Sequence, residues 1–206
     1  MDGVLIEAKD WHYEALNRAL RNFGLEISRH DHLTTYDGLP TKKKLEMLSV
    51  EMGLPRRLHT FLNELKQKYT LEIVSTLCRP TFAHEYALAR LKSENYKIAV
   101  CSNSVRTSVD TMLSLAGIDS YMDITLSNED VKNSKPDPEI YVTAMKQFGL
   151  EAHECLILED NENGIKAAYA SGAHVLEIGT TEDTNYDNIA EAIKLAEQRS
   201  GLSDGV

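Results

Sequence analysis

Four short segments of this 206-residue sequence carry side chains that could bind a phosphoryl group and a metal ion. Adjacent carboxylates are hard oxygen ligands that suit Mg²⁺. A serine at a helix N-terminus and a lysine ammonium group are donors that suit phosphate oxygens. The segments are Asp2-Gly3, Ser102-Asn103-Ser104, Lys135-Pro136-Asp137-Pro138 and Glu159-Asp160-Asn161.

The overall charge narrows the choice of partner. With 32 acidic and 22 basic residues, the formal net charge is −10, so a nucleic acid would be repelled. The clearest run of cations is Lys42-Lys43-Lys44. An anionic substrate would therefore need a local positive field, which Mg²⁺ and Lys135 could supply.

The elements that would position these segments follow from the hydrophobic pattern. Short apolar runs at residues 97–101, 124–126, 155–158 and 174–178 predict strands, and amphipathic stretches between them predict helices. Apolar strands alternating with helices are typical of a doubly wound α/β domain, whose parallel sheet is covered on both faces. Ligands bind such sheets beyond the carboxyl ends of the strands, so the polar segments should meet at one edge.

The front third of the chain has a different pattern. Residues 12–70 show apolar positions at helical spacing and no strand pattern, which predicts a small helical unit with its own interior. We therefore predict a core formed by residues 1–10 and 77–206, with an α-helical cap, residues 11–76, inserted into it.

Several features favour a cytoplasmic protein without a membrane segment. The longest apolar runs are about five residues, and the N-terminus MDGVLIEAKD lacks the pattern of a secretory signal. Cys78, Cys101 and Cys155 form an odd set without C-x-x-C spacing, which favours reduced thiols. We expect Cys101 and Cys155, which fall in strand-like runs, to be buried.

In their order and context, the four segments resemble the motifs of the haloacid dehalogenase (HAD) superfamily, in particular its cap-bearing phosphatases and phosphomutases, the β-phosphoglucomutase-like branch. The resemblance covers residues 1 to about 180. It implies a Rossmann-like HAD core with an inserted helical cap. Met1–Leu5 is similar to the end of the first motif, Ser102–Ser104 to the second, Lys135–Pro138 to the third and Glu159–Gly164 to the fourth.

The resemblance implies a Mg²⁺-dependent phosphomonoester hydrolase that acts on a small phosphorylated metabolite, such as a sugar phosphate, through an aspartyl-phosphate. Asp2 matches the catalytic acid and base of that family, and the backbone carbonyl at this position also binds the metal. Lys135 matches the catalytic cation that binds the phosphate and orients the nucleophile.

The remaining motif residues have implied binding roles beside plainer alternatives. Ser102 and Asn103 match phosphate donors, although either could simply cap a helix. Glu159 and Asp160 match metal ligands together with Asp2, although an acid pair also suits a helix N-terminus.

The sequence departs from the family at its start. The nucleophilic aspartate of the family lies two residues before the Asp2 position, upstream of Met1, and the strand that leads into it is missing as well. Either Met1 is the internal methionine of an Asp-Met-Asp motif, which we favour, or the chain is truncated and impaired. Loss of a central strand would leave unpaired backbone groups on both neighbouring strands and expose apolar surface.

The cap supplies further candidates. His12 matches a histidine of the first cap helix that contacts the active site, the alternative being a residue that caps or packs. Gly38 resembles the glycine of the cap's substrate-specificity loop, the alternative being a turn before Pro40. We expect Lys42, Lys43 and Lys44 to be solvated, although a cap that screens an anionic substrate would also explain them.

Three other functions compete. A β-phosphoglucomutase-like phosphomutase would return the phosphoryl group to a sugar, and no residue separates it from a hydrolase. A non-catalytic phosphate-binding remnant would keep the pocket without the nucleophile. A dehalogenase is disfavoured because the Glu159-Asp160 pair suits a metal that dehalogenases do not need. We expect a monomer or weak dimer.

Overall fold

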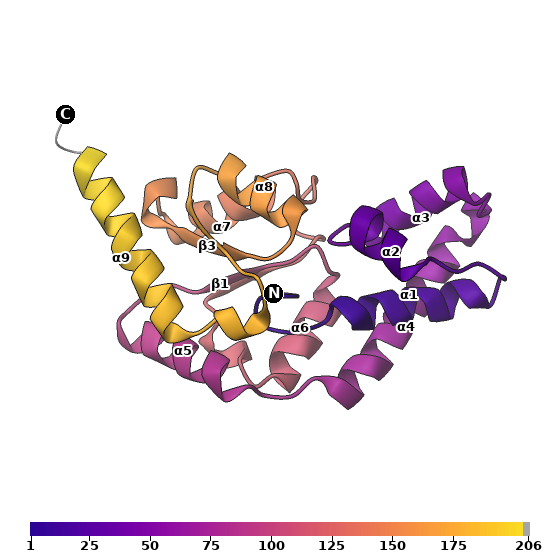
Figure 1. The fold of residues 1–206 in the computed structure, drawn as a ribbon, viewed down its shortest axis with the longest axis horizontal. Coiled ribbons are helices and arrows are strands. Elements are labelled where there is room, and N and C mark those ends of the chain that lie inside the picture. Colours follow the sequence, from indigo (N-terminus) through magenta and orange to yellow (C-terminus); the bar gives the residue numbers. More distant parts are fainter. Residues whose placement is uncertain (204–206) are drawn as a thin grey trace.

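The front of the chain is a helical cap. The computed structural model describes the backbone of residues 1–203 and the side chains of residues 1–199. The cap elements (Figure 1) are α1 (Lys9–Arg21), α2 (Arg29–Asp31), the π-helical turn η1 (His32–Tyr36), α3 (Thr41–Glu51), the 3₁₀ turn η2 (Arg56–Leu58) and α4 (His59–Leu77).

The cap has an apolar interior of its own. Leu20, Leu45, Leu48 and Leu62 are fully buried and belong to one cluster built from cap residues. Helices α1 and α4 lie side by side along its length (Figure 1). Residues 12–70 therefore form helices around a shared interior, as the periodicity predicts, whereas the division of the chain at residues 11 and 77 stays a prediction.

The rest of the chain alternates strands with helices, which confirms the predicted α/β class. None of the helices in the described part is long and apolar enough to cross a membrane. The elements are α5 (Phe82–Ser93), β1 (Ala99–Cys101), α6 (Arg106–Leu115), η3 (Asp119–Tyr121), β2 (Ile124–Leu126), α7 (Glu139–Phe148), η4 (Ala152–Glu154), β3 (Leu156–Glu159), α8 (Glu162–Ala170), β4 (His174–Glu177), η5 (Thr181–Asp183) and α9 (Tyr186–Ser203).

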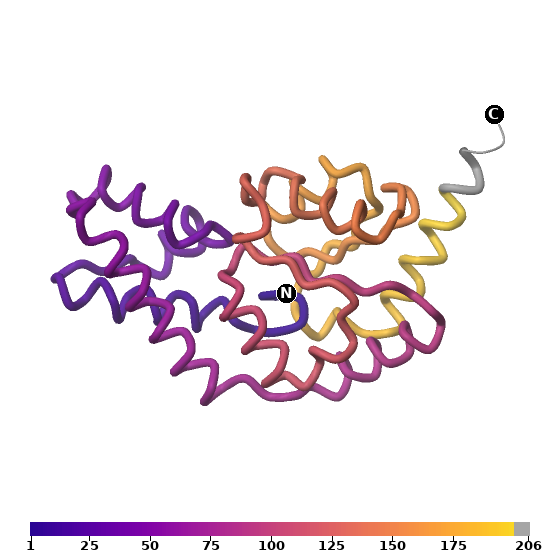
Figure 2. The backbone as a smooth tube through the Cα atoms, turned by 180° about the vertical axis from the view of Figure 1, so that it is seen from behind, coloured from indigo at the N-terminus to yellow at the C-terminus, as the bar shows by residue number. Residues whose placement is uncertain are grey.

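The parallel sheet is present in two halves. Strand β1 pairs in parallel with β2, and β3 pairs in parallel with β4, but within residues 1–203 no strand joins β1 to β3. The N-terminus lies in the middle of the core (Figure 2). The two pairs of strands are therefore separate from one another within the described residues.

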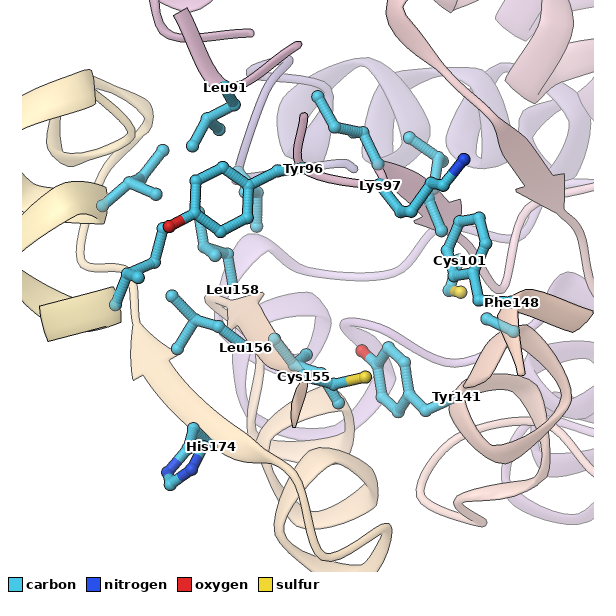
Figure 3. A pocket seen from close by; sticks show the side chains of 18 of the residues that line it. Leu91, Tyr96, Lys97, Cys101, Tyr141, Phe148, Cys155, Leu156, Leu158 and His174 are labelled. Carbon is cyan, nitrogen blue, oxygen red and sulfur yellow. The ribbon is translucent and has the colours of Figure 1, made fainter. Parts of the chain in front are cut away.

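A cavity of about 640 Å³ occupies the gap between the two half-sheets (Figure 3). Its lining is mostly apolar and comes from β1, β3, α5, α7, α9 and Met1. This cavity corrects one expectation. Cys101 and Cys155 line it and are only half-buried, because no strand covers them there, whereas Cys78 is buried.

Candidate active site

A second cavity, of about 280 Å³, lies between the cap and the core. Five of the residues predicted from the sequence line it, namely Asp2, His12, Gly38, Asn103 and Asp160. The other three predicted residues are buried and do not line this cavity; they are Ser102, Lys135 and Glu159.

A tight turn positions Asp2 against Asp160. The turn closes when the Gly3 amide donates to the Ile6 carbonyl at 2.8 Å. Gly3 has a φ of +71°, and a Cβ atom built there would lie 1.9 Å from Oδ2 of Asp160. Only glycine fits this position, because a side chain would be strained and would displace the carboxylate.

His12 links Asp2 to a buried lysine of the cap. Its Nε2 lies 3.3 Å from Oδ2 of Asp2, and its Nδ1 lies 3.1 Å from Nζ of Lys66. Because a lysine ammonium group can only donate, Nδ1 accepts and the proton sits on Nε2. His12 therefore donates to Asp2, which also accepts a hydrogen bond from the Ser104 hydroxyl at 3.1 Å.

The electrostatics of this chain of contacts keep Asp2 ionised. Burial alone would raise the pKa of Asp2, but His12, the Met1 ammonium group and the Ser104 hydroxyl outweigh burial and hold the pKa well below its usual range. Burial and the charge of Lys66 lower the pKa of His12. Oδ1 of Asp2 is buried without a hydrogen-bond partner among the described residues, so this oxygen can meet a cation or a water proton.

Four lysines bring positive charge to the cavity, namely Lys9, Lys42, Lys44 and Lys66. Lys44 and Lys66 are buried, each 7% exposed. Burial lowers the pKa of Lys44 to about 8 and that of Lys66 to about 7. The expectation of a solvated Lys44 is wrong, because α3 turns this residue inward while Lys42 and Lys43 stay exposed.

Sequence reasoning did not single out Lys66, although a signal was available. Leu62, Lys66 and Thr70 recur at a spacing of four residues and all lie on the buried face of α4. A lysine on a stripe that a helix buries is unusual, because an ammonium group loses solvation there. The i, i+4 spacing from Leu62 could have marked Lys66 as a site residue.

Lys135 and Glu159 form a buried ion pair behind the cavity. The Lys135 ammonium group donates to Oε1 of Glu159 and, at 3.0 Å, to the carbonyl of Cys101. The Tyr141 hydroxyl donates to the same Glu159 oxygen. Burial alone would raise the pKa of Glu159, but the charges of Lys135 and the Met1 ammonium group lower it overall.

The carboxylate oxygens at this site meet the requirements of a Mg²⁺ site in part. In the described part of the chain, no three His, Cys, Asp or Glu side chains form a metal-binding group. Mg²⁺ is commonly bound by one or two carboxylates together with waters and phosphate oxygens. Asp2 and Asp160 suit that arrangement. Oδ1 of Asp2 has no hydrogen-bond partner among the described residues. Burial and the charge of Glu159 raise the pKa of Asp160 to about 6, although the Met1 ammonium group opposes this rise. Both oxygens of Glu159 have partners, so its role as a ligand stays a prediction.

Asn103 and Ser102 make contacts within the protein. The Asn103 amide donates to the carbonyls of Gly38 and Lys135 at 3.0 and 3.3 Å, and its oxygen accepts from the Lys135 amide. The Ser102 hydroxyl accepts from the Ser104 amide at 3.1 Å. Asn103 thus joins a cap loop to a core loop, and binding of phosphate by Ser102 and Asn103 stays a prediction.

The cap loop at Gly38 also contacts the start of α8. Gly38 has a φ of +70°, and a Cβ atom there would lie 2.2 Å from Oδ1 of Asn161. Asn161 caps α8 by accepting from the Asn163 amide at 3.0 Å, and its amide donates to Asp37 at 2.9 Å. Asn163 donates to the Asp37 carbonyl at 3.5 Å. These contacts hold the cap loop over the cavity.

Known proteins share this chain's sequence pattern. The family model of haloacid dehalogenase-like hydrolases matches residues 1–178. A phosphorylated carbohydrates phosphatase of Thermotoga maritima is 25% identical over 84% of this chain and 79% of its own length. A phosphoglycolate phosphatase of Photorhabdus laumondii is 27% identical over 90% of this chain and 80% of its own length.

Solved structures share the fold. A β-phosphoglucomutase from Clostridium difficile superposes with a TM-score of 0.80 at 21% identity, covering 94% of each chain. CbbY from Rhodobacter sphaeroides, solved in complex with phosphate, gives a TM-score of 0.76 at 19% identity and covers 85% of this chain and 81% of its own. These likenesses confirm the predicted fold class. Because the family model covers most of the sequence, the chain belongs to the haloacid dehalogenase-like hydrolases.

Proposed function

We propose that this chain is a Mg²⁺-dependent phosphomonoester hydrolase that acts on a small sugar phosphate. The observation that carries the proposal is the cavity between cap and core, which four lysines line together with Asp2 and Asp160. A protein with a net charge of −10 that buries cations there offers donors for phosphate oxygens. The volume of about 280 Å³ suits a small metabolite, and the T. maritima relative is named a phosphatase of phosphorylated carbohydrates.

The residues of the cavity have distinct proposed roles. Asp160 and Asp2 would hold Mg²⁺, which would neutralise negative charge on the transferring phosphoryl group. Asp2, ionised and oriented by the Nε2–H of His12, accepts a proton from the attacking water. In the preceding step Asp2 gives a proton to the leaving oxygen, so substrate must bind to the form with a protonated Asp2, which is the form that proton transfer from the attacking water regenerates.

The nucleophile in this proposal is an aspartate two positions before Asp2, a position that the sequence does not contain. Its carboxylate attacks the phosphorus atom, the bond to the sugar oxygen breaks, and an aspartyl-phosphate forms. Water activated by Asp2 then attacks this phosphorus, which releases inorganic phosphate and frees the carboxylate. Lys135, which reaches the carboxyl end of β1, is placed to orient that nucleophile.

The test compares this chain with a form extended before Met1 by a short apolar strand that ends in the required aspartate. Both are assayed for Mg²⁺-dependent phosphate release from a panel of sugar phosphates. We expect turnover only in the extended form, and its loss when the added aspartate is changed to asparagine or when Asp2→Asn is introduced.

Two other results would replace the hydrolase. Conversion of one sugar phosphate isomer to another without net phosphate release would indicate a phosphomutase. Saturable binding of a sugar phosphate by the extended form, with no turnover on any substrate of the panel, would indicate a non-catalytic phosphate-binding protein.

A further inference from the structure

Lys9 lies between a carboxylate of the cap and a carboxylate of the core. It is the first residue of α1, which begins where the cap meets the core (Figure 1). Its ammonium nitrogen lies 3.5 Å from Oδ2 of Asp37 in the cap loop and 3.7 Å from Oδ2 of Asp160, the residue directly after β3. Lys9 therefore links the cap to an acid that would hold Mg²⁺ in the proposed function.

These two contacts of Lys9 depend on charge and not on directed hydrogen bonds. Both distances exceed the roughly 2.7–3.2 Å of an N–H···O hydrogen bond. The Lys9 side chain makes no hydrogen bond within the described residues, and it is 34% exposed, so water can solvate its ammonium group when a carboxylate moves away. An ion pair of this kind forms and separates at little cost in free energy.

Lys135 pairs with the neighbouring acid, Glu159, in a different way. Its ammonium group donates a hydrogen bond to Glu159 and a second one, at 3.0 Å, to the carbonyl of Cys101. The side chain of Lys135 is only 7% exposed. Lys135 is thus fixed at its carboxylate, whereas Lys9 is free to leave Asp160.

A divalent cation would compete with Lys9 for one oxygen atom. A Cβ atom built on Gly3 would lie 1.9 Å from Oδ2 of Asp160 and 2.9 Å from its Oδ1, so Oδ2 is the oxygen nearer to the turn that carries Asp2. A cation shared by Asp2 and Asp160 would therefore meet the oxygen that Lys9 already contacts. Two cations at one carboxylate oxygen repel each other, and the divalent ion has the larger charge.

We propose that Lys9 and a divalent cation are alternative partners of Asp160, so that binding of the cation detaches the cap from the core at this carboxylate. The Lys9 ammonium group then stays with Asp37, and the cap loop keeps its amide contacts to Asn103 and Asn161. Lys9 is a positioning residue, because it acts through Asp160 and takes no part in bond making. The proposal rests on the metal site of the proposed function.

The first test measures cation affinity in the full chain. Mn²⁺ prefers the same oxygen ligands as Mg²⁺, and electron paramagnetic resonance follows the free ion during a titration. Lys9→Met should bind Mn²⁺ about three- to fivefold more tightly than the parent, whereas Lys9→Arg, which keeps the charge, should bind it as the parent does. Lys42→Met removes an exposed cation that lines the same cavity without an ion pair among the described residues. It should change the affinity less than about twofold, because solvent screens this charge.

The second test follows the Lys9 ammonium group itself. Acetic anhydride labels lysine amines, and mass spectrometry gives the rate of labelling at each residue. Mn²⁺ should speed the labelling of Lys9 severalfold. Lys135 should stay slow with and without the cation, and Lys166, whose side chain is 61% exposed, should stay fast. Asp160→Asn should make Lys9 react fast without any cation.

The outcomes separate this proposal from the proposed function. Equal Mn²⁺ affinity in the parent and Lys9→Met, or unchanged labelling of Lys9 while Mn²⁺ is bound, overturns the proposal and leaves the metal site in place. An equal gain in affinity from Lys42→Met also overturns it, because the effect would then belong to the general charge of the cavity. If neither the parent nor Lys9→Met binds Mn²⁺ saturably, the proposal fails together with the metal site. Phosphate release is not a readout, so the hydrolase is tested separately.

Discussion

The cap and the core bury their apolar side chains in different ways. In the cap, Leu20, Leu45, Leu48 and Leu62 are fully enclosed by helices, which satisfy their own backbone groups. In the core, β1 and β3 border a cavity of about 640 Å³ because each strand needs a neighbour to pair with. The difference teaches that helices can close a compact unit from local sequence, whereas β1 and β3 are each paired on one side only in the described structure and leave space between them.

The largest expected effect tests what holds the open core together. Lys135→Met would leave the Glu159 carboxylate buried without its cation, so we expect the free energy of unfolding to fall by about 3–5 kcal/mol. Urea unfolding followed by circular dichroism measures it. Lys166→Met, which breaks an exposed ion pair with Glu162, is the matched control and should change stability by about 0.5 kcal/mol or less. Equal losses would mean that the buried pair does not hold the core.

A pair of leucine variants compares the two interiors directly. Leu62→Ala opens a cavity in the packed cap and should lower the free energy of unfolding by about 2–5 kcal/mol. Leu158→Ala should lower it less, because Leu158 already borders empty space. Val50, 79% exposed on the cap, serves as the control, and Val50→Ala should stay within about 0.5 kcal/mol. A larger loss at Leu158 than at Leu62 would show that the core is as tightly packed as the cap.

The smallest effect concerns the cavity that the two regions share. Burial lowers the pKa of Lys44 to about 8, so Lys44 is charged below this pH and loses its proton as the pH rises through it. Affinity for inorganic phosphate, measured by isothermal titration calorimetry, should therefore fall as the pH rises from about 8 to about 9.5, where most of the phosphate is already the dianion.

Variants of the same lysine run check this assignment. Lys44→Gln should weaken phosphate binding about tenfold at neutral pH, the equivalent of about 1.4 kcal/mol, and should remove the decline near pH 8. Lys43→Gln, at an exposed position of the same helix that does not line the cavity, should leave both unchanged. A decline that persists in Lys44→Gln would assign it to another group.

Local pattern was enough to predict the strands and the helices between them. The apolar runs ending at Cys101 and Leu158 became β1 and β3, because β-branched and leucine residues in short runs suit buried strands. The rule that ligands bind beyond strand ends also placed Asp2, Asn103 and Asp160 around one cavity.

Contacts between distant segments could not be predicted in this way. Lys44 looked solvated because its own helix gives no sign that the core faces it. Cys101 and Cys155 are half-buried because both line the cavity between the two half-sheets, where the described residues place no strand. Helix α5 went unpredicted because Phe82 and Tyr86 are exposed and blur its apolar face.

The contacts between Asp37, Gly38 and the core asparagines bear on how long a ligand stays. Each is a single amide hydrogen bond that water can replace at a net change of about 1 kcal/mol, so lifting the cap loop needs little energy. A ligand that touches Lys44 or Lys66 on the cap and Asp160 on the core through a cation gains contacts only while the loop is down. The residence time of the ligand would then lengthen with each contact that it makes to both the cap and the core. The dissociation rate would therefore depend on the ligand and not on the cap loop alone.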